Sequence, residues 1–146
     1  RLFPDAKVFH KRRTSLVKFA RQVYQFGVAR PILNQRHPGS GKLTYWFPSL
    51  FSLGYIFVLL SLICHLFIVP FQSDWFFLPF AFYVIYSILI SFDSLIKTNS
   101  VFVAQIALHI VIIQFTAYGF GFLKSWIYLN IFRIKPEKAF PDHFSN

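Results

Sequence analysis

Four adjacent basic residues, His10-Lys11-Arg12-Arg13, form the densest group of chemically active side chains in the sequence. They follow a short β-prone run, Ala6–His10, and precede Thr14, a residue type that caps helices. An arginine can hold a phosphate through two parallel hydrogen bonds, and the free amide groups of a first helical turn also favour anions. The cluster therefore fits the diphosphate of a substrate. Taken alone, it fits an anchor for lipid headgroups better.

The acidic residues form no catalytic or metal-binding pattern. The five acids are scattered singly along the chain, at Asp5, Asp74, Asp93, Glu137 and Asp142. Acid–base catalysis and divalent-metal binding need carboxylates held close together, so we assign no catalytic residue and no metal ligand in this sequence. The single cysteine, Cys64, excludes an internal disulfide and a multi-cysteine metal site.

The composition is typical of an integral membrane protein. Of the 146 residues, 55% are hydrophobic and 14% are charged, and the mean hydropathy is +0.52. Three apolar runs are candidates for transmembrane helices, over residues 46–69, 75–92 and 101–123. A helix needs about 20 apolar residues to cross the hydrocarbon core, so the first and third runs are long enough and the second is marginal. We predict a mostly α-helical fold with about three transmembrane helices.

The distribution of charge predicts the side of the membrane on which each end lies. Ten of the fifteen Lys and Arg residues lie at or before Lys42, so the N-terminal part is expected in the cytoplasm. Three crossings then place the C-terminal tail outside, although that tail carries Lys124, Arg133, Lys135 and Lys138. Alternatively, the second run is a re-entrant or interfacial segment, which leaves two crossings and a cytoplasmic tail. We favour three crossings, and the alternative stays open.

The segment between the basic cluster and the first apolar run is expected to dock onto the membrane. A helix predicted over Ser15–Gly27 has an apolar stripe opposite Lys18 and Arg21, so it should lie in the headgroup plane. Pro31 is expected to begin another short helical turn. The chain thus divides into residues 1–13 with the terminal strand and the basic cluster, 14–44 with the interfacial helix and a linker, 45–123 with the spans, and 124–146 as the tail.

The basic cluster and the amphipathic helix together read VFHKRRTSLVKFARQVYQFGVAR, and a turn and apolar spans follow. This order, which covers most of the chain, resembles the C-terminal part of bacterial membrane-associated family 2 glycosyltransferases. In that family a cytoplasmic GT-A α/β domain, which binds a nucleotide sugar, ends in a strand and continues into an interfacial helix and membrane helices. The resemblance implies that residues 1–13 end such a domain. Its Asp-x-Asp-type site for Mg or Mn and its catalytic base would then lie upstream of Arg1.

The same resemblance implies roles for individual residues. Related processive synthases carry a Gln-x-x-Arg-Trp motif on the interfacial helix, which contacts the donor diphosphate and the acceptor. The equivalent positions here are Gln22, Gln25 and Phe26, so the first glutamine matches, Gln25 replaces the Arg, and an aromatic residue stands at the Trp position. The missing guanidinium points to transfer of single sugars. The implied contacts to the donor diphosphate are His10, Arg12, Arg13 and Gln22, and the acceptor-side candidates are Gln25 and Phe26.

We therefore expect the membrane-anchoring end of a glycosyltransferase in the bacterial inner membrane. It would transfer a sugar from a nucleotide-sugar donor to a cell-envelope or lipid-linked acceptor at the cytoplasmic face. The chain begins at Arg1 without a signal peptide, and we interpret it as part of a longer protein, inactive alone and binding no cofactor itself. The expected partners are anionic lipids, the donor and the acceptor, and we expect no binding of nucleic acid. The alternative is a non-enzymatic scaffold or subunit whose basic segment binds lipid; a transporter is less favoured.

Overall fold

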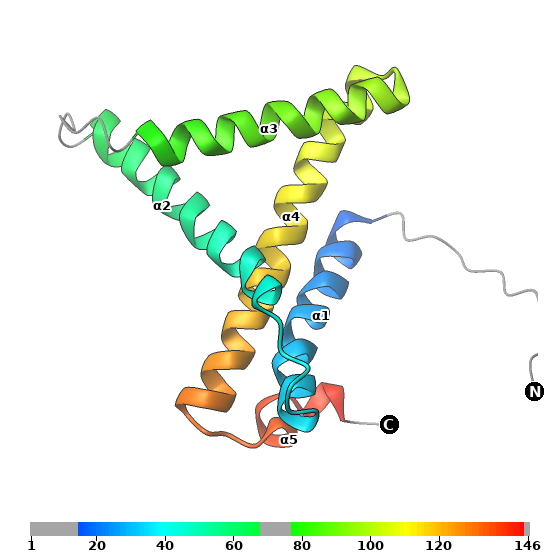
Figure 1. Cartoon of the computed structure of the whole chain (residues 1–146), viewed down its shortest axis with the longest axis vertical. Helices are drawn as coiled ribbons and strands as arrows, with labels where there is room; N and C mark the ends of the chain where they lie inside the picture. Colours follow the sequence, from blue (N-terminus) through cyan, green and yellow to red (C-terminus); the bar gives the residue numbers. More distant parts are fainter. Residues whose placement is uncertain (1–14, 68–76, 145–146) are drawn as a thin grey trace, which may run out of the picture.

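A computed structural model describes residues 15–67 and 77–144, and their regular elements are all helical (Figure 1). The elements are α1 (Leu16–Arg36), a 3-10 turn (Leu43–Trp46), α2 (Phe47–Phe67), α3 (Phe77–Thr98), α4 (Val101–Trp126), a π-helical continuation (Ile127–Ile131), α5 (Pro136–Ala139) and a last 3-10 turn (Pro141–His143). The strand predicted over Ala6–His10 lies outside the described residues.

Three helices are long and apolar enough to cross a membrane, as predicted. They are Leu43–His65, Leu78–Thr98 and Val101–Ile131. Few of their residues are buried inside the isolated chain, at 22%, 0% and 6% of the three apolar windows, which leaves their side chains free to meet lipid. The chain is therefore a mostly α-helical, multi-pass membrane protein.

The first helix is longer than predicted, because Gly27 and Pro31 lie inside α1 instead of ending and restarting a helix. Glycine and proline both disfavour a helix interior, so the sequence pattern predicted a break. Here Gly27 is buried where α1 touches α4, and Pro31 is also buried in the same helix. Tertiary packing thus outweighs the local preference for a break.

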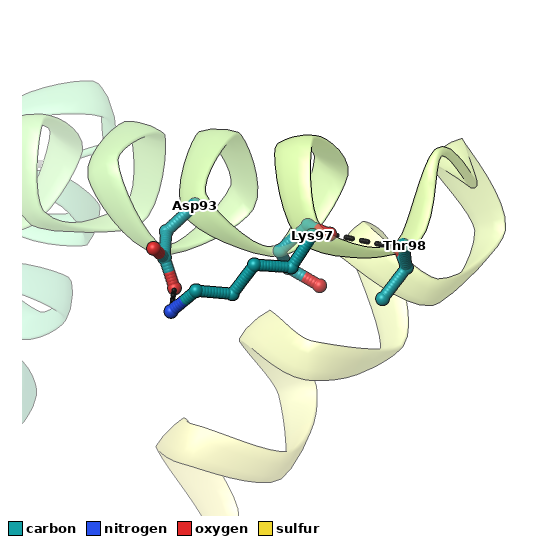
Figure 2. A network of polar contacts seen from close by, with 4 residues as sticks. Asp93, Lys97 and Thr98 are labelled. Atoms are coloured by element: carbon teal, nitrogen blue, oxygen red, sulfur yellow. Dashed lines mark hydrogen bonds and ion pairs between the residues drawn. The ribbon is translucent and has the colours of Figure 1, made fainter.

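Helix α3, which corresponds to the second predicted apolar run, extends past the predicted end of that run at residue 92. Asp93 and Lys97 lie one turn apart on α3, and their side chains form an ion pair of 2.9 Å (Figure 2). The Thr98 hydroxyl donates a hydrogen bond of 2.7 Å to the Ser94 carbonyl oxygen (Figure 2). Such pairs at a spacing of four residues stabilise a helix, so the two charges continue α3 to Thr98. Asn99, with φ 51°, then turns the chain into α4.

The backbones of α1 and α4 are in direct contact. A Cβ atom added at Gly27 would clash with the Tyr118 carbonyl oxygen and lie 2.9 Å from the Phe122 nitrogen. One added at Gly121 would clash with the Tyr24 carbonyl oxygen. The two helices run side by side in the same direction over the C-terminal half of α4 (Figure 1). The predicted position of α1 in the headgroup plane stays a prediction.

The first turns of α2 pack against α4 in the opposite direction. The Ser49 hydroxyl donates to the Gly119 carbonyl oxygen at 3.1 Å, and the Ser52 hydroxyl donates to the Phe115 carbonyl oxygen at 3.0 Å. One turn earlier, the rings of Trp46 and Trp126 meet at 5.1 Å between centroids. Small residues and interhelical hydrogen bonds are how membrane helices associate when lipid offers no hydrophobic drive.

Beyond this contact, α2 and α4 diverge, and α3 joins their far ends to close a triangle (Figure 1). Aromatic side chains reach from α3 into the triangle. The Tyr83 hydroxyl donates to the Phe51 carbonyl oxygen at 2.7 Å, and the Phe51 and Phe115 rings lie 4.8 Å apart. The Tyr86 ring contacts both phenylalanines. An aromatic cluster therefore holds α3 across the opening.

The tail folds back onto α1. The buried Phe140 packs with Val28, Ile32 and Leu129, which joins the tail to both long helices. Arg36, the last residue of α1, lies 3.8 Å from the Glu137 carboxylate and 4.9 Å from the Phe144 ring. The C-terminal tail and the end of α1 therefore lie at the same end of the molecule (Figure 1).

Candidate functional site

Three of the residues that the sequence assigns to a donor diphosphate, His10, Arg12 and Arg13, lie outside the described residues. The fourth, Gln22, lies on α1 with the acceptor-side candidates Gln25 and Phe26. Gln22 and Gln25 are half-buried, and Phe26 is 58% exposed. Gln22 and Phe26 are one helical turn apart, so their side chains share a face of α1.

A groove runs along this face, between α1, the start of α2 and α4. Its cavity volume is about 650 Å³. The lining residues are Phe19, Val23, Phe26, Ala29, Arg30 and Leu33 of α1, Pro48 of α2, and Gln114, Phe115 and Tyr118 of α4. The lining is largely apolar, with Arg30, Gln114 and Tyr118 as its polar members. The structure thus brings Phe26 into the groove, whereas neither Gln22 nor Gln25 lines it.

Arg30 is the cation of this groove, and aromatic residues hold it in place. Its guanidinium carbon lies 4.3 Å from the centre of the Tyr45 ring, a cation–π contact. The guanidinium also interacts electrostatically with the Tyr118 hydroxyl. Within the described part of the chain no carboxylate pairs with Arg30, in contrast to Arg36, which is close to Glu137. Arg30 is therefore a partly buried positive charge that keeps its capacity for an anion.

The position of Arg30 depends on the tight packing beneath it. Gly27 lies one turn before it on α1 and presses against the backbone of α4 at Tyr118 and Phe122. Trp46, next to Tyr45, contacts the rings of Phe122 and Trp126 at 5.0 and 5.1 Å. Contacts among α1, α4 and the turn before α2 thus fix Tyr45 and Tyr118, the two aromatic neighbours of Arg30, and the helix that carries Arg30.

The groove combines one cation with a largely apolar lining, a combination that suits an amphiphile. Its positive charge suits a phosphate or another anion, and its apolar length suits a hydrocarbon chain. Among the described residues, no three His, Cys, Asp or Glu side chains gather as a metal site would require. No residue in the described ranges is assigned to the divalent metal that the resemblance implies.

Sequence reasoning alone did not identify Arg30 and Tyr45. Arg30 is one of ten Lys and Arg residues in the first 42 positions, and nothing in its spacing distinguishes it. Arg30 stands out only in the folded chain, where α1, the turn before α2 and α4 bring Tyr45 and Tyr118 beside it. Gly119 and Gly121, in contrast, are small residues of the kind found at close helix contacts, and a Cβ atom at either position would clash with a neighbouring backbone.

Comparison with known proteins adds no name to this site. No protein-family model, no curated protein sequence and no solved structure matches the chain.

Proposed function

We propose that this chain is the membrane-docking end of a glycosyltransferase that works at the cytoplasmic face of a bacterial membrane. In this proposal α1 presents polar residues to the diphosphate of a nucleotide sugar, and the groove holds the acceptor. The acceptor is an amphiphile, with an anionic group at Arg30 and its apolar chain along Phe26 and Phe115.

One observation carries the proposal. Phe26, which occupies the aromatic position of the interfacial-helix motif, and Arg30, a cation without a carboxylate partner in the described ranges, line the same groove beside an apolar spanning helix. A soluble acceptor has no need of an apolar channel that follows a membrane helix. A lipid-linked acceptor needs both the channel and an anion contact at its end.

The donor side of the proposal rests on position along α1. Gln22 is one turn before Phe26 on the same face, so a donor bound at Gln22 and an acceptor bound at Phe26 would be neighbours. Transfer would join an acceptor oxygen to the anomeric carbon as the bond from that carbon to the diphosphate breaks. The acceptor proton would pass to a base in the upstream domain, and the nucleoside diphosphate would leave.

The test is a transfer assay on the complete gene product in isolated membranes. A panel of UDP-, GDP- and dTDP-sugars with Mg²⁺ is supplied, and release of the nucleoside diphosphate is measured. We expect release with at least one donor, reduced roughly 10-fold or more by Arg30→Ala and by Gln22→Ala, because removing a charge-assisted contact costs about 1.5–3 kcal/mol.

Arg21→Ala is the matched control, because Arg21 is an exposed arginine on the same helix and does not line the groove. Its rate should stay within a factor of two of the wild type. Equal rates for Arg21→Ala and Arg30→Ala would contradict the role of the groove. Absence of release with every donor would favour the non-enzymatic lipid-binding scaffold.

A further inference from the structure

The start of α2 and the end of α4 lie at the same level of the molecule. The Trp46 and Trp126 rings meet at 5.1 Å, and Ser49 bonds to Gly119 within the next turn. Trp46 directly precedes α2, and Trp126 is the last residue of α4. Indole rings favour the membrane–water interface, and two rings in contact mark one interface.

This contact restricts the number of crossings. Three successive crossings would place the start of α2 and the end of α4 on opposite sides, about 30 Å apart across the hydrocarbon core. Two positions in ring contact are on one side, so an even number of the three helices cross. The chain leaves the contact along α2 and returns to it along α4, and α3 connects the far ends of these two helices (Figure 1).

The surface of α3 fits a helix that remains in the hydrocarbon without crossing. Six large apolar residues form a single stripe along it, at spacings of three and four, and are 52–62% exposed: Leu78, Phe82, Ile85, Leu89, Phe92 and Ile96. The Tyr83 hydroxyl, on a different face, bonds to α2. The charged pair Asp93–Lys97 lies at the end that turns into α4 (Figure 2). Acyl chains of the far leaflet would cover the stripe.

The linker after α1 and the C-terminal tail lie at the same end of the molecule, and both are basic. Seven described Lys and Arg residues lie there: Arg30, Arg36, Lys42, Lys124, Arg133, Lys135 and Lys138. Two acids, Glu137 and Asp142, accompany them in the tail. Lys18 and Arg21 lie on the first turns of α1, away from this end, and at the opposite end, as far as it is described, Lys97 pairs with Asp93. Positive residues prefer the cytoplasmic side, so this asymmetry gives the orientation.

We propose that the linker before α2 and the C-terminal tail together form one basic collar that binds anionic lipid headgroups on the cytoplasmic leaflet, and that the chain crosses the membrane twice. The collar is residues 36–42 and 124–138. Phe140 fixes the tail against Val28 and Ile32, so the two parts of the collar stay together. The occupant is lipid because the collar surrounds the ends of two apolar spans, at the depth where headgroups lie. This inference is independent of the proposed enzymatic function.

The topology is tested by cysteine labelling of the complete gene product, with its native cysteines, including Cys64, replaced by serine. Lys42→Cys, Asn99→Cys and Lys138→Cys are treated with a membrane-impermeant maleimide in spheroplasts and in inverted vesicles. We expect Lys42→Cys and Lys138→Cys to label in inverted vesicles, and Asn99→Cys to label in spheroplasts. Labelling of Lys42→Cys and Lys138→Cys from opposite sides would overturn the inference.

Headgroup binding is tested on the purified complete protein in detergent. Phosphatidylglycerol should raise the midpoint of thermal unfolding more than phosphatidylcholine does. Arg133→Ala/Lys135→Ala/Lys138→Ala should remove at least half of that difference, whereas Lys97→Ala, at the far end, should keep it. Equal stabilisation by both lipids, or an unchanged difference in the triple variant, would overturn the collar.

Discussion

Two glycines decide how closely α1 approaches α4. Gly27 and Gly121 each face the backbone of the other helix, where any side chain would meet atoms that cannot rotate away. Because the helices touch at these points, Arg30 and Tyr118 come within reach of each other. The shape of the groove therefore depends on the two glycines, which lack a side chain, as much as on the residues that line it.

Replacing either glycine should weaken the protein. Gly27→Ala and Gly121→Ala are each expected to lower the free energy of unfolding by about 1–3 kcal/mol, the usual cost of overpacking. Gly41→Ala is the control, since a Cβ there would lie 3.6 Å from the Asn34 Nδ2 atom, an ordinary contact. Thermal unfolding in detergent measures the effect, and equal midpoints for the three variants would contradict the close contact.

The serine bonds between α2 and α4 should contribute less. Ser49→Ala removes an interhelical hydrogen bond and is expected to cost about 0.6 kcal/mol, the average for such bonds in a membrane protein, and at most about 1.7 kcal/mol. Ser87→Ala is the matched comparison, because that hydroxyl bonds to Tyr83 of its own helix. Unfolding by denaturing detergent gives both values. A larger loss at Ser87 would argue against the α2–α4 contact.

The helices themselves were largely predictable, because length and apolarity are properties of a segment alone. The three candidate spans follow from apolar runs that are visible in the sequence. The boundaries were less predictable, since they depend on neighbours. The sequence predicts a helix end at Gly27, although α4 packs against this residue, and it predicts that the second run ends before Asp93, although Lys97 pairs with Asp93 on the same helix. Arg30 could not be assigned from sequence, because Tyr45 and Tyr118 are distant along the chain.

At the scale of elements, the tail is held chiefly by Phe140. Phe140→Ala should free the tail from α1, with a local loss of about 3–5 kcal/mol, the typical cost of emptying a buried phenylalanine site. Limited trypsin digestion, followed at Arg133 and Lys138, should become markedly faster. Phe132→Ala is the control, because Phe132 is 61% exposed, and its digestion rate should equal the wild type's. Equal rates for both variants would show that Phe140 does not hold the tail.

For the whole molecule, the roles that we propose for the groove and the basic collar serve one task, which is to hold an amphiphile at the membrane surface. A membrane scaffold would need the collar and the spans. A glycosyltransferase would need, in addition, the groove beside α1 and a nucleotide-sugar domain upstream. We expect the coding sequence upstream of Arg1 to specify alternating strands and helices with paired aspartates. A coding sequence without such a region would remove the enzymatic proposal and leave the scaffold.

The most direct test of the proposed function follows the sugar itself. Membranes containing the complete gene product are given the radiolabelled nucleotide sugar that supports nucleoside diphosphate release, and the lipids are then extracted with organic solvent. The account predicts that label enters the lipid extract, and that Phe26→Ala and Arg30→Ala reduce it together, because both residues line the groove. Label that stays entirely in the aqueous phase, or that reaches the lipid equally in both variants and the wild type, would contradict it.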